Sequence, residues 1–177
     1  MNVLRERLKN ESPELFQALE RSWEIAWNEW LPAMGVNRDS YNSFPHLKNL
    51  EAYFDQVITS FETVAVAGSE PFISPTEIYI LLSAILFHDI GRVPASGDAH
   101  AKESRDIIIK QWNGLGIQSI ELARSIAEIC GCHDCAPSEW ETETKSLNNV
   151  VIDPYGEVRE RFLACLLVLI DHLDGAF

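Results

Sequence analysis

The chain has 177 residues, 46% of them hydrophobic and 23% charged, which is the composition of a globular domain and excludes a disordered tail or a fibre. Acidic residues outnumber basic ones by 27 to 14, and the formal charge of −13 opposes the counterion release that drives bulk nucleic-acid binding. The longest uncharged apolar stretches, 81–87 and 162–170, are far shorter than the ~20 residues that cross a bilayer. No secretory signal begins the chain, and four cysteines suit a reducing compartment, so we expect a cytoplasmic protein.

The first predicted helix spans residues 12–30. Ser12 is placed to act as its N-cap, and Pro13 occupies the first helical position. Apolar residues then recur at spacings of three and four, which predicts a face packed against the core: Leu19, Trp23, Ala26, Trp27 and Trp30. An aromatic platform for nucleic-acid bases is the alternative, but the acidic neighbours of these residues disfavour it.

Five more helices are predicted, at residues 46–66, 74–87, 99–112, 119–131 and 159–173. The helix over 74–87 starts with a capping box and is apolar on nearly all sides, which is typical of a central buried helix. Residues 132–156 are expected to be irregular, apart from a short β-hairpin near 150–158. We therefore predict an all-α, single-domain bundle of about six helices, in which residues 1–45 form an N-terminal helix and connection that pack on residues 46–177.

A histidine and an aspartate, His88 and Asp89, lie where the most apolar helix is expected to end. Burying such a pair costs free energy unless both groups are satisfied, and a metal ion would satisfy both. Adjacent helical residues project about 100° apart, so the pair would hold one ion at a helix end or bridge two ions. Asp171 is similarly unusual because it ends an apolar run.

Three further histidines, His46, His100 and His133, fall near the ends of other predicted helices. Taken singly, each is more often a boundary or core residue than a ligand. Together with His88, Asp89 and Asp171 they can converge on one site. His172 projects about 100° away from Asp171 and is expected to be a surface residue.

This ordered set, with the run His88-Asp89-Ile90-Gly91-Arg92, resembles the HD-domain metal-dependent phosphohydrolase superfamily over about residues 46–174. The run 161–174 is most similar to the HD domains associated with Hsp90-like ATPases. The resemblance implies a primary metal site at His46, His88, Asp89 and Asp171. It also implies a second ion that shares Asp89 and is completed by His100 and His133, as in the binuclear branch. The ligand types suit one or two divalent ions of Fe, Mn, Co, Ni, Zn or Mg.

The activity that the resemblance implies is hydrolysis of a phosphoester in a small phosphorylated or nucleotide substrate by a metal-activated hydroxide, with Asp89 in the catalytic centre. Arg92 and Lys102 are candidate phosphate contacts and Arg105 is a third, although solvated surface charges are an equal alternative. Asp134 stands where some binuclear members have another histidine, so the sequence leaves open whether a second ion binds.

Two other functions stay open at this point. Cys130, Cys132, His133 and Cys135 offer four ligands for a structural zinc, but their spacing is not that of a zinc knuckle, and buried inert thiols are expected. A catalytically idle HD-fold module that senses a nucleotide or docks a partner, such as an ATPase domain, is the second alternative. The complete ligand set favours the enzyme.

Overall fold

The computed structural model describes residues 2–32, 44–64, 71–92, 100–134 and 140–175. These residues form an all-α fold with one two-stranded hairpin, as predicted. The α-helices are α1 (Val3–Glu11), α2 (Pro13–Ile25), α4 (Phe44–Val64), α5 (Pro75–Phe87), α6 (His100–Gln111), α7 (Ile120–Gly131), α8 (Trp140–Lys145) and α9 (Glu160–Gly175). A π-helix, η1 (Ala26–Trp30), continues α2, and a 3-10 turn, η3 (Ile90–Arg92), follows α5.

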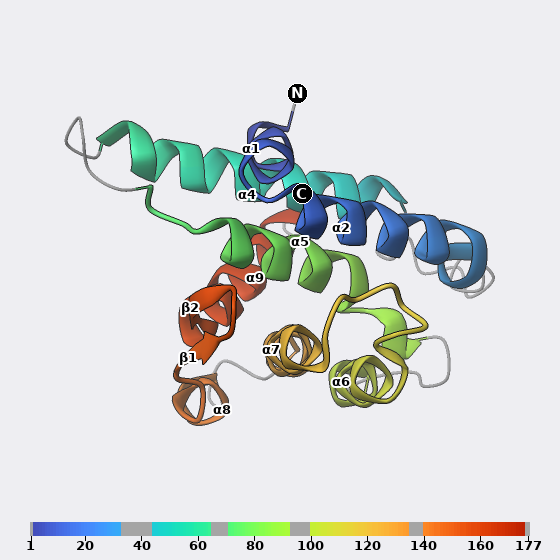
Figure 1. Cartoon of the computed structure of the whole chain (residues 1–177). Coiled ribbons are helices and arrows are strands. Elements are labelled where there is room, and N and C mark those ends of the chain that lie inside the picture. Colours follow the sequence, from blue (N-terminus) through green and yellow to red (C-terminus); the bar gives the residue numbers. More distant parts are fainter. Residues whose placement is uncertain (1, 33–43, 65–70, 93–99, 135–139, 176–177) are drawn as a thin grey trace.

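Helix α5 is the centre of the fold. Figure 1 shows it below α2 and α4 and above α6 and α7, and it also packs against α1 and α9. All its side chains from Thr76 to Phe87 are buried, which fits a sequence that is apolar on all sides. The predicted capping box is confirmed: the Glu77 N–H donates to Ser74 Oγ (3.2 Å), and the Ser74 N–H donates to Glu77 Oε2 (3.0 Å). Because the start of α5 is buried and capped, the position of the helix is fixed, and so is the position of His88 and Asp89 directly after its end.

The N-terminal region differs from the prediction. The 12–30 segment is preceded by the separate helix α1, whose Leu4 and Leu8 are buried. The Ser12 hydroxyl does not cap α2 but donates to Glu14 Oε1. The expected apolar face also fails at Trp27, which is 55% exposed. Its ring instead lies edge-on to that of Phe44, with 5.2 Å between the ring centroids, whereas Trp30 at the end of the π-helix still packs on the core.

The predicted hairpin is confirmed near 150–158. Strands β1 (Asn149–Ile152) and β2 (Gly156–Arg159) pair antiparallel, with Val150 opposite Val158. Gly156 adopts a φ of +90°, a conformation that favours glycine at this turn. Helix α8 corrects the expectation that residues 132–156 are irregular outside the hairpin.

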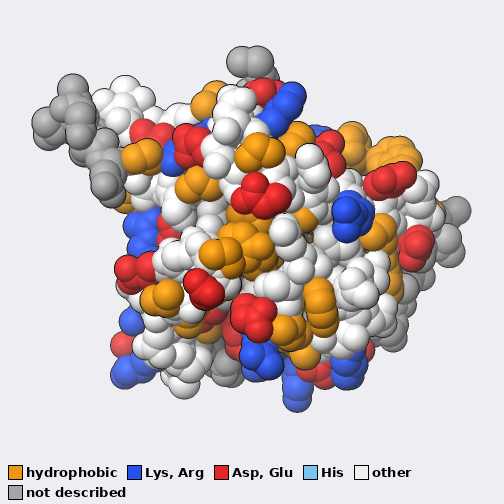
Figure 2. Space-filling model, in the orientation of Figure 1, with side chains coloured by type: hydrophobic (Ala, Val, Ile, Leu, Met, Phe, Trp, Pro, Cys, Tyr) orange, Lys and Arg blue, Asp and Glu red, His pale blue; other side chains and the backbone are white. Residues whose placement is uncertain are grey.

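The surface in Figure 2 carries acidic and basic side chains over the whole visible face, with apolar side chains between them. Within the described residues, no helix combines the length and apolar character needed to span a membrane.

Candidate metal centre

Five elements bring the six predicted ligands together. His46 lies on α4, His88 and Asp89 follow α5, and Asp171 lies on α9. His100 is the first residue of α6, and His133 comes two residues after the end of α7. Four histidines and one aspartate of this set are at most 5% exposed. We call these six residues the His-Asp cluster: His46, His88, Asp89, His100, His133 and Asp171.

One end of the cluster joins α4, α5 and α9. His46 Nε2 lies 3.4 Å from His88 Nε2 and 3.4 Å from Asp171 Oδ1. His88 Nε2 lies 3.9 Å from the same Asp171 oxygen. These three ligand atoms are close enough to one another to hold one metal ion.

The other end is built around Asp89. Its Oδ2 lies 3.5 Å from His88 Nε2, while its Oδ1 lies 3.1 Å from His100 Nε2 and 3.4 Å from His133 Nε2. The Nε2 atoms of His100 and His133 are 3.0 Å apart. Asp89 Oδ2 therefore faces His88 and Oδ1 faces His100 and His133, an arrangement that suits a carboxylate shared between two ions.

The outer nitrogen of each clustered histidine is already occupied. His88 Nδ1 donates to the carbonyl of Ile85 (2.9 Å), and His133 Nδ1 donates to that of Cys130 (2.7 Å). A carbonyl only accepts, so in their neutral form both rings present an unprotonated Nε2 to the cluster. Several nitrogen lone pairs thus meet around ionised oxygens, and a divalent cation fits this donor set.

The protonation states support the same conclusion. Burial lowers the pKa of the His88 imidazole, against a smaller opposing effect of the Asp89 carboxylate. Burial would raise the pKa of Asp89, but the neighbouring rings of His88, His100 and His133 outweigh it and hold that pKa well below its usual range. A neutral imidazole and an ionised carboxylate are the forms that bind metal ions.

Carboxylates orient the other two histidines. His46 Nδ1 lies 2.7 Å from Asp174 Oδ2, and Asn49 donates to the second oxygen of Asp174 (2.7 Å). His100 Nδ1 lies 3.2 Å from Asp134 Oδ2. Asp134, which stands where some binuclear members have another histidine, therefore contacts a candidate ligand. Nothing in the sequence indicated the role of Asn49, apart from its position three residues after His46 on one helix.

The turn that carries His88 and Asp89 is fastened to α6 by Ser104. The Gly91 N–H donates to Ser104 Oγ (2.8 Å), and this hydroxyl donates to the His88 carbonyl (2.5 Å). Ser104 is fully buried and lies one helical turn after His100. It thereby holds two ligand-bearing elements in register, a role that the sequence analysis missed.

The predicted phosphate contacts have different surroundings. Arg92 reaches the cluster, since its Nε donates to Asp89 Oδ1 (2.8 Å). Lys102 is exposed on α6, two residues after His100, a spacing at which side chains do not face each other. Arg105 pairs with Glu128 (2.6 Å). His172 is exposed and donates to the carbonyl of Val168 (2.9 Å).

The cysteine segment is arranged differently from a zinc site. Burial raises the pKa of the Cys130 thiol, which donates to the carbonyl of Ala84 (3.6 Å). His133 presents its Nε2 to the His-Asp cluster, and Cys135 is outside the described residues. Among the described residues, the two groups able to hold a metal contain no cysteine.

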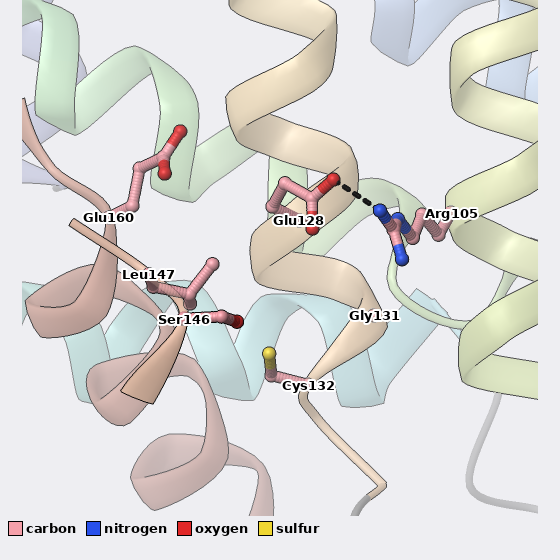
Figure 3. A pocket seen from close by; sticks show the side chains of 7 residues that line it. All are labelled: Arg105, Glu128, Gly131, Cys132, Ser146, Leu147 and Glu160. Carbon is pink, nitrogen blue, oxygen red and sulfur yellow. Dashed lines mark hydrogen bonds and ion pairs between the residues drawn. The ribbon is translucent and has the colours of Figure 1, made fainter. Parts of the chain in front are cut away.

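A separate cavity of about 330 Å³ borders α7, and none of its lining residues belongs to the His-Asp cluster. Figure 3 shows the Arg105–Glu128 ion pair at this cavity. The buried Glu160 accepts a hydrogen bond from Ser125 (2.7 Å), and burial raises its pKa. Arg105 therefore has an acidic partner beside this cavity.

Comparison with known proteins gives one match. The family described as HD-CE matches residues 44–174, about three-quarters of the chain. This range contains the whole His-Asp cluster. No curated protein and no solved structure matches.

Proposed function

The chain belongs to the HD-CE family, and we propose that it is a metal-dependent phosphohydrolase with a binuclear centre at the His-Asp cluster. The proposal rests chiefly on Asp89, whose Oδ2 faces His88 (3.5 Å) and whose Oδ1 faces His100 (3.1 Å) and His133 (3.4 Å). Arg92 supplies one cation to this carboxylate, at Oδ1 (2.8 Å). The Nε2 atoms of His88 and His133 beside it are buried, and their burial costs free energy unless a partner such as a divalent cation satisfies them. Six ligands from five elements are more than a structural ion pair needs.

Each residue has a distinct task in this proposal. His46, His88 and Asp171 hold the first ion, His100 and His133 hold the second, and Asp89 is shared. When bound, divalent ions lower the pKa of water and neutralise charge on a phosphoryl group. Asp174 and Asp134 keep the rings of their histidine partners oriented toward the ions.

The substrate we propose is a small phosphorylated molecule, with a nucleotide as the first choice. A chain with a net charge of −13 has little general attraction for anions, so local cations must provide it. Arg92 is about one-third exposed and lies against Asp89, and it can reach solvent on one side and the cluster on the other. Lys102 is retained as a weaker candidate, and a cytoplasmic location and an ATPase-domain partner remain proposals.

Metal analysis of protein purified without added metal, followed by a panel of phosphomonoesters, phosphodiesters and nucleotides, tests the proposal. We expect one or two divalent ions per chain and hydrolysis of a panel member. Asp89→Asn should lose most of the metal and at least ~100-fold in activity, in line with the several kcal/mol that metal polarisation supplies.

His172→Ala is the matched control, because it removes an exposed histidine next to Asp171 and should leave metal and activity unchanged. Full metal content in Asp89→Asn would contradict the assigned centre. Metal-loaded protein that hydrolyses no panel member but binds a nucleotide would favour the idle sensing module instead.

A further inference from the structure

Arg92 sits at the end of the η3 turn, three residues after Asp89. Its backbone N–H donates to the Asp89 carbonyl (2.9 Å), and its Nε donates to Asp89 Oδ1 (2.8 Å). The Asp89 side chain is 7% exposed and that of Arg92 is 34% exposed. A short turn thus places a permanent cation on a buried carboxylate while leaving part of that cation open to solvent.

The oxygen that Arg92 contacts belongs to one side of the centre. Asp89 Oδ1 is also the atom that faces His100 Nε2 (3.1 Å) and His133 Nε2 (3.4 Å). The other oxygen, Oδ2, faces His88 (3.5 Å). Arg92 therefore contacts the carboxylate oxygen that a second ion would use. It does not contact Oδ2, the oxygen on the side of the first ion.

A guanidinium and a divalent cation cannot both make close use of one oxygen without strong repulsion. Among the arginines and lysines that the structure describes, Arg92 forms an ion pair with a residue of the His-Asp cluster. Its exposed part can bind a phosphate, an anion whose geometry guanidinium groups match.

We propose that Arg92 and the second divalent ion compete for Asp89 Oδ1, and that a phosphate group on the substrate relieves this competition by drawing the guanidinium away. Substrate phosphate then favours binding of the second ion, and by linkage that ion favours phosphate. The second ion therefore binds when a phosphorylated ligand binds. This inference rests on the proposed binuclear function and adds a regulation of its second site.

The test starts from the 177-residue chain loaded with one ion and titrates it with Mn²⁺. Free Mn²⁺ is measured by electron paramagnetic resonance, with and without inorganic phosphate. Without phosphate, Arg92→Gln should bind the second Mn²⁺ about tenfold more tightly than wild type, within the usual range of coupling between sites. Phosphate should tighten Mn²⁺ binding in wild type by a larger factor than in Arg92→Gln.

Two controls separate charge and position. Arg105→Gln removes an arginine paired with Glu128 rather than with the cluster, and it should behave like wild type. Arg92→Lys retains a cation at the same position and should bind the second ion more weakly than Arg92→Gln does. Thermal melting of each variant confirms that the protein is folded.

The outcomes are distinguishable. Equal or weaker second-ion affinity in Arg92→Gln would overturn the competition. An equal phosphate effect in wild type and Arg92→Gln would mean that phosphate acts through the ions alone, and it would overturn the role of Arg92. Failure of the wild-type protein to bind any metal would instead refute the proposed function itself.

Discussion

The two nitrogens of each clustered histidine face different surroundings. Nε2 points into the cluster, while Nδ1 contacts a carbonyl in His88 and His133 and a carboxylate in His46 and His100. A carboxylate partner raises the basicity of an imidazole ligand more than a neutral carbonyl does. The partner of His46 is the better protected, since Asp174 is 13% exposed and also bound by Asn49, whereas Asp134 is 38% exposed.

The two aspartates of α9 should therefore respond differently to the same substitution. Asp171→Asn replaces a candidate ligand and should lose the first ion and at least ~100-fold in activity. Asp174→Asn leaves the ligand set intact but weakens the orientation of His46, so metal affinity should fall by about tenfold to a hundredfold. Competition against a chelator measures both affinities. Equal losses, or the reverse order, would move the C-terminal ligand by one helical turn to Asp174.

At the scale of elements, the packing of α6 against the η3 turn decides whether both ends of the cluster can form. A Cβ added to Gly91 would lie 2.1 Å from the His100 carbonyl oxygen and 2.5 Å from the Ser104 nitrogen. Both are backbone atoms of α6, so the helix itself would have to move. Glycine at this position permits the approach that brings His100 to Asp89.

Gly91→Ala should accordingly destabilise the protein by about 1–3 kcal/mol or more and separate His100 from Asp89. Ser104→Ala keeps the approach but leaves the Gly91 N–H without its partner, at a cost of about 1–3 kcal/mol. Urea unfolding measures both changes. Gly131→Ala is the control, because its nearest neighbour is the flexible side chain of Arg105 at 3.2 Å. A loss in Gly131→Ala as large as in Gly91→Ala would contradict the proposed close approach.

Elements with a clear apolar pattern or cap were predictable from sequence, and those without one were not. Helix α5 was recognised by its capping box and apolar run. Helix α8 was missed because its six residues, mostly charged or polar, carry no apolar period. The π-helix at Ala26–Trp30 depends on backbone bonding that composition does not reveal. The exposure of Trp27 was not foreseen either, because apolar spacing alone does not show that its ring lies against Phe44.

The same contrast holds within the site. The order of histidines and aspartates indicated the six residues that the structure brings together. The supporting contacts of Asn49 and Ser104 join elements far apart in sequence, so no local pattern specifies them. Residue type alone also does not show where a basic side chain points. Arg92 contacts Asp89, whereas Lys102 is exposed.

At the scale of the whole molecule, the His-Asp cluster joins helices that are far apart in the sequence. Its candidate ligands come from α4, the turn after α5, α6, the end of α7 and α9, and these helices also form the hydrophobic core. Metal bound by such a set stabilises the folded state, because the unfolded chain cannot hold the ligands in place. Without a cation, the facing nitrogens of His100 and His133, 3.0 Å apart, repel unless a proton lies between them.

Removal of the metal should consequently lower the melting temperature of the whole domain in a single transition. An ion present at 100 times its dissociation constant contributes about 2.7 kcal/mol, and 1 kcal/mol shifts the melting temperature of a chain this size by roughly 2–4 °C. We therefore expect a fall of about 5–10 °C on chelation, measured by circular dichroism, and recovery when a divalent ion is restored. His88→Ala combined with Asp89→Ala should abolish the response to chelator, whereas His172→Ala should retain it. A chelator effect that persists in the double variant would place the stabilising ion outside the His-Asp cluster.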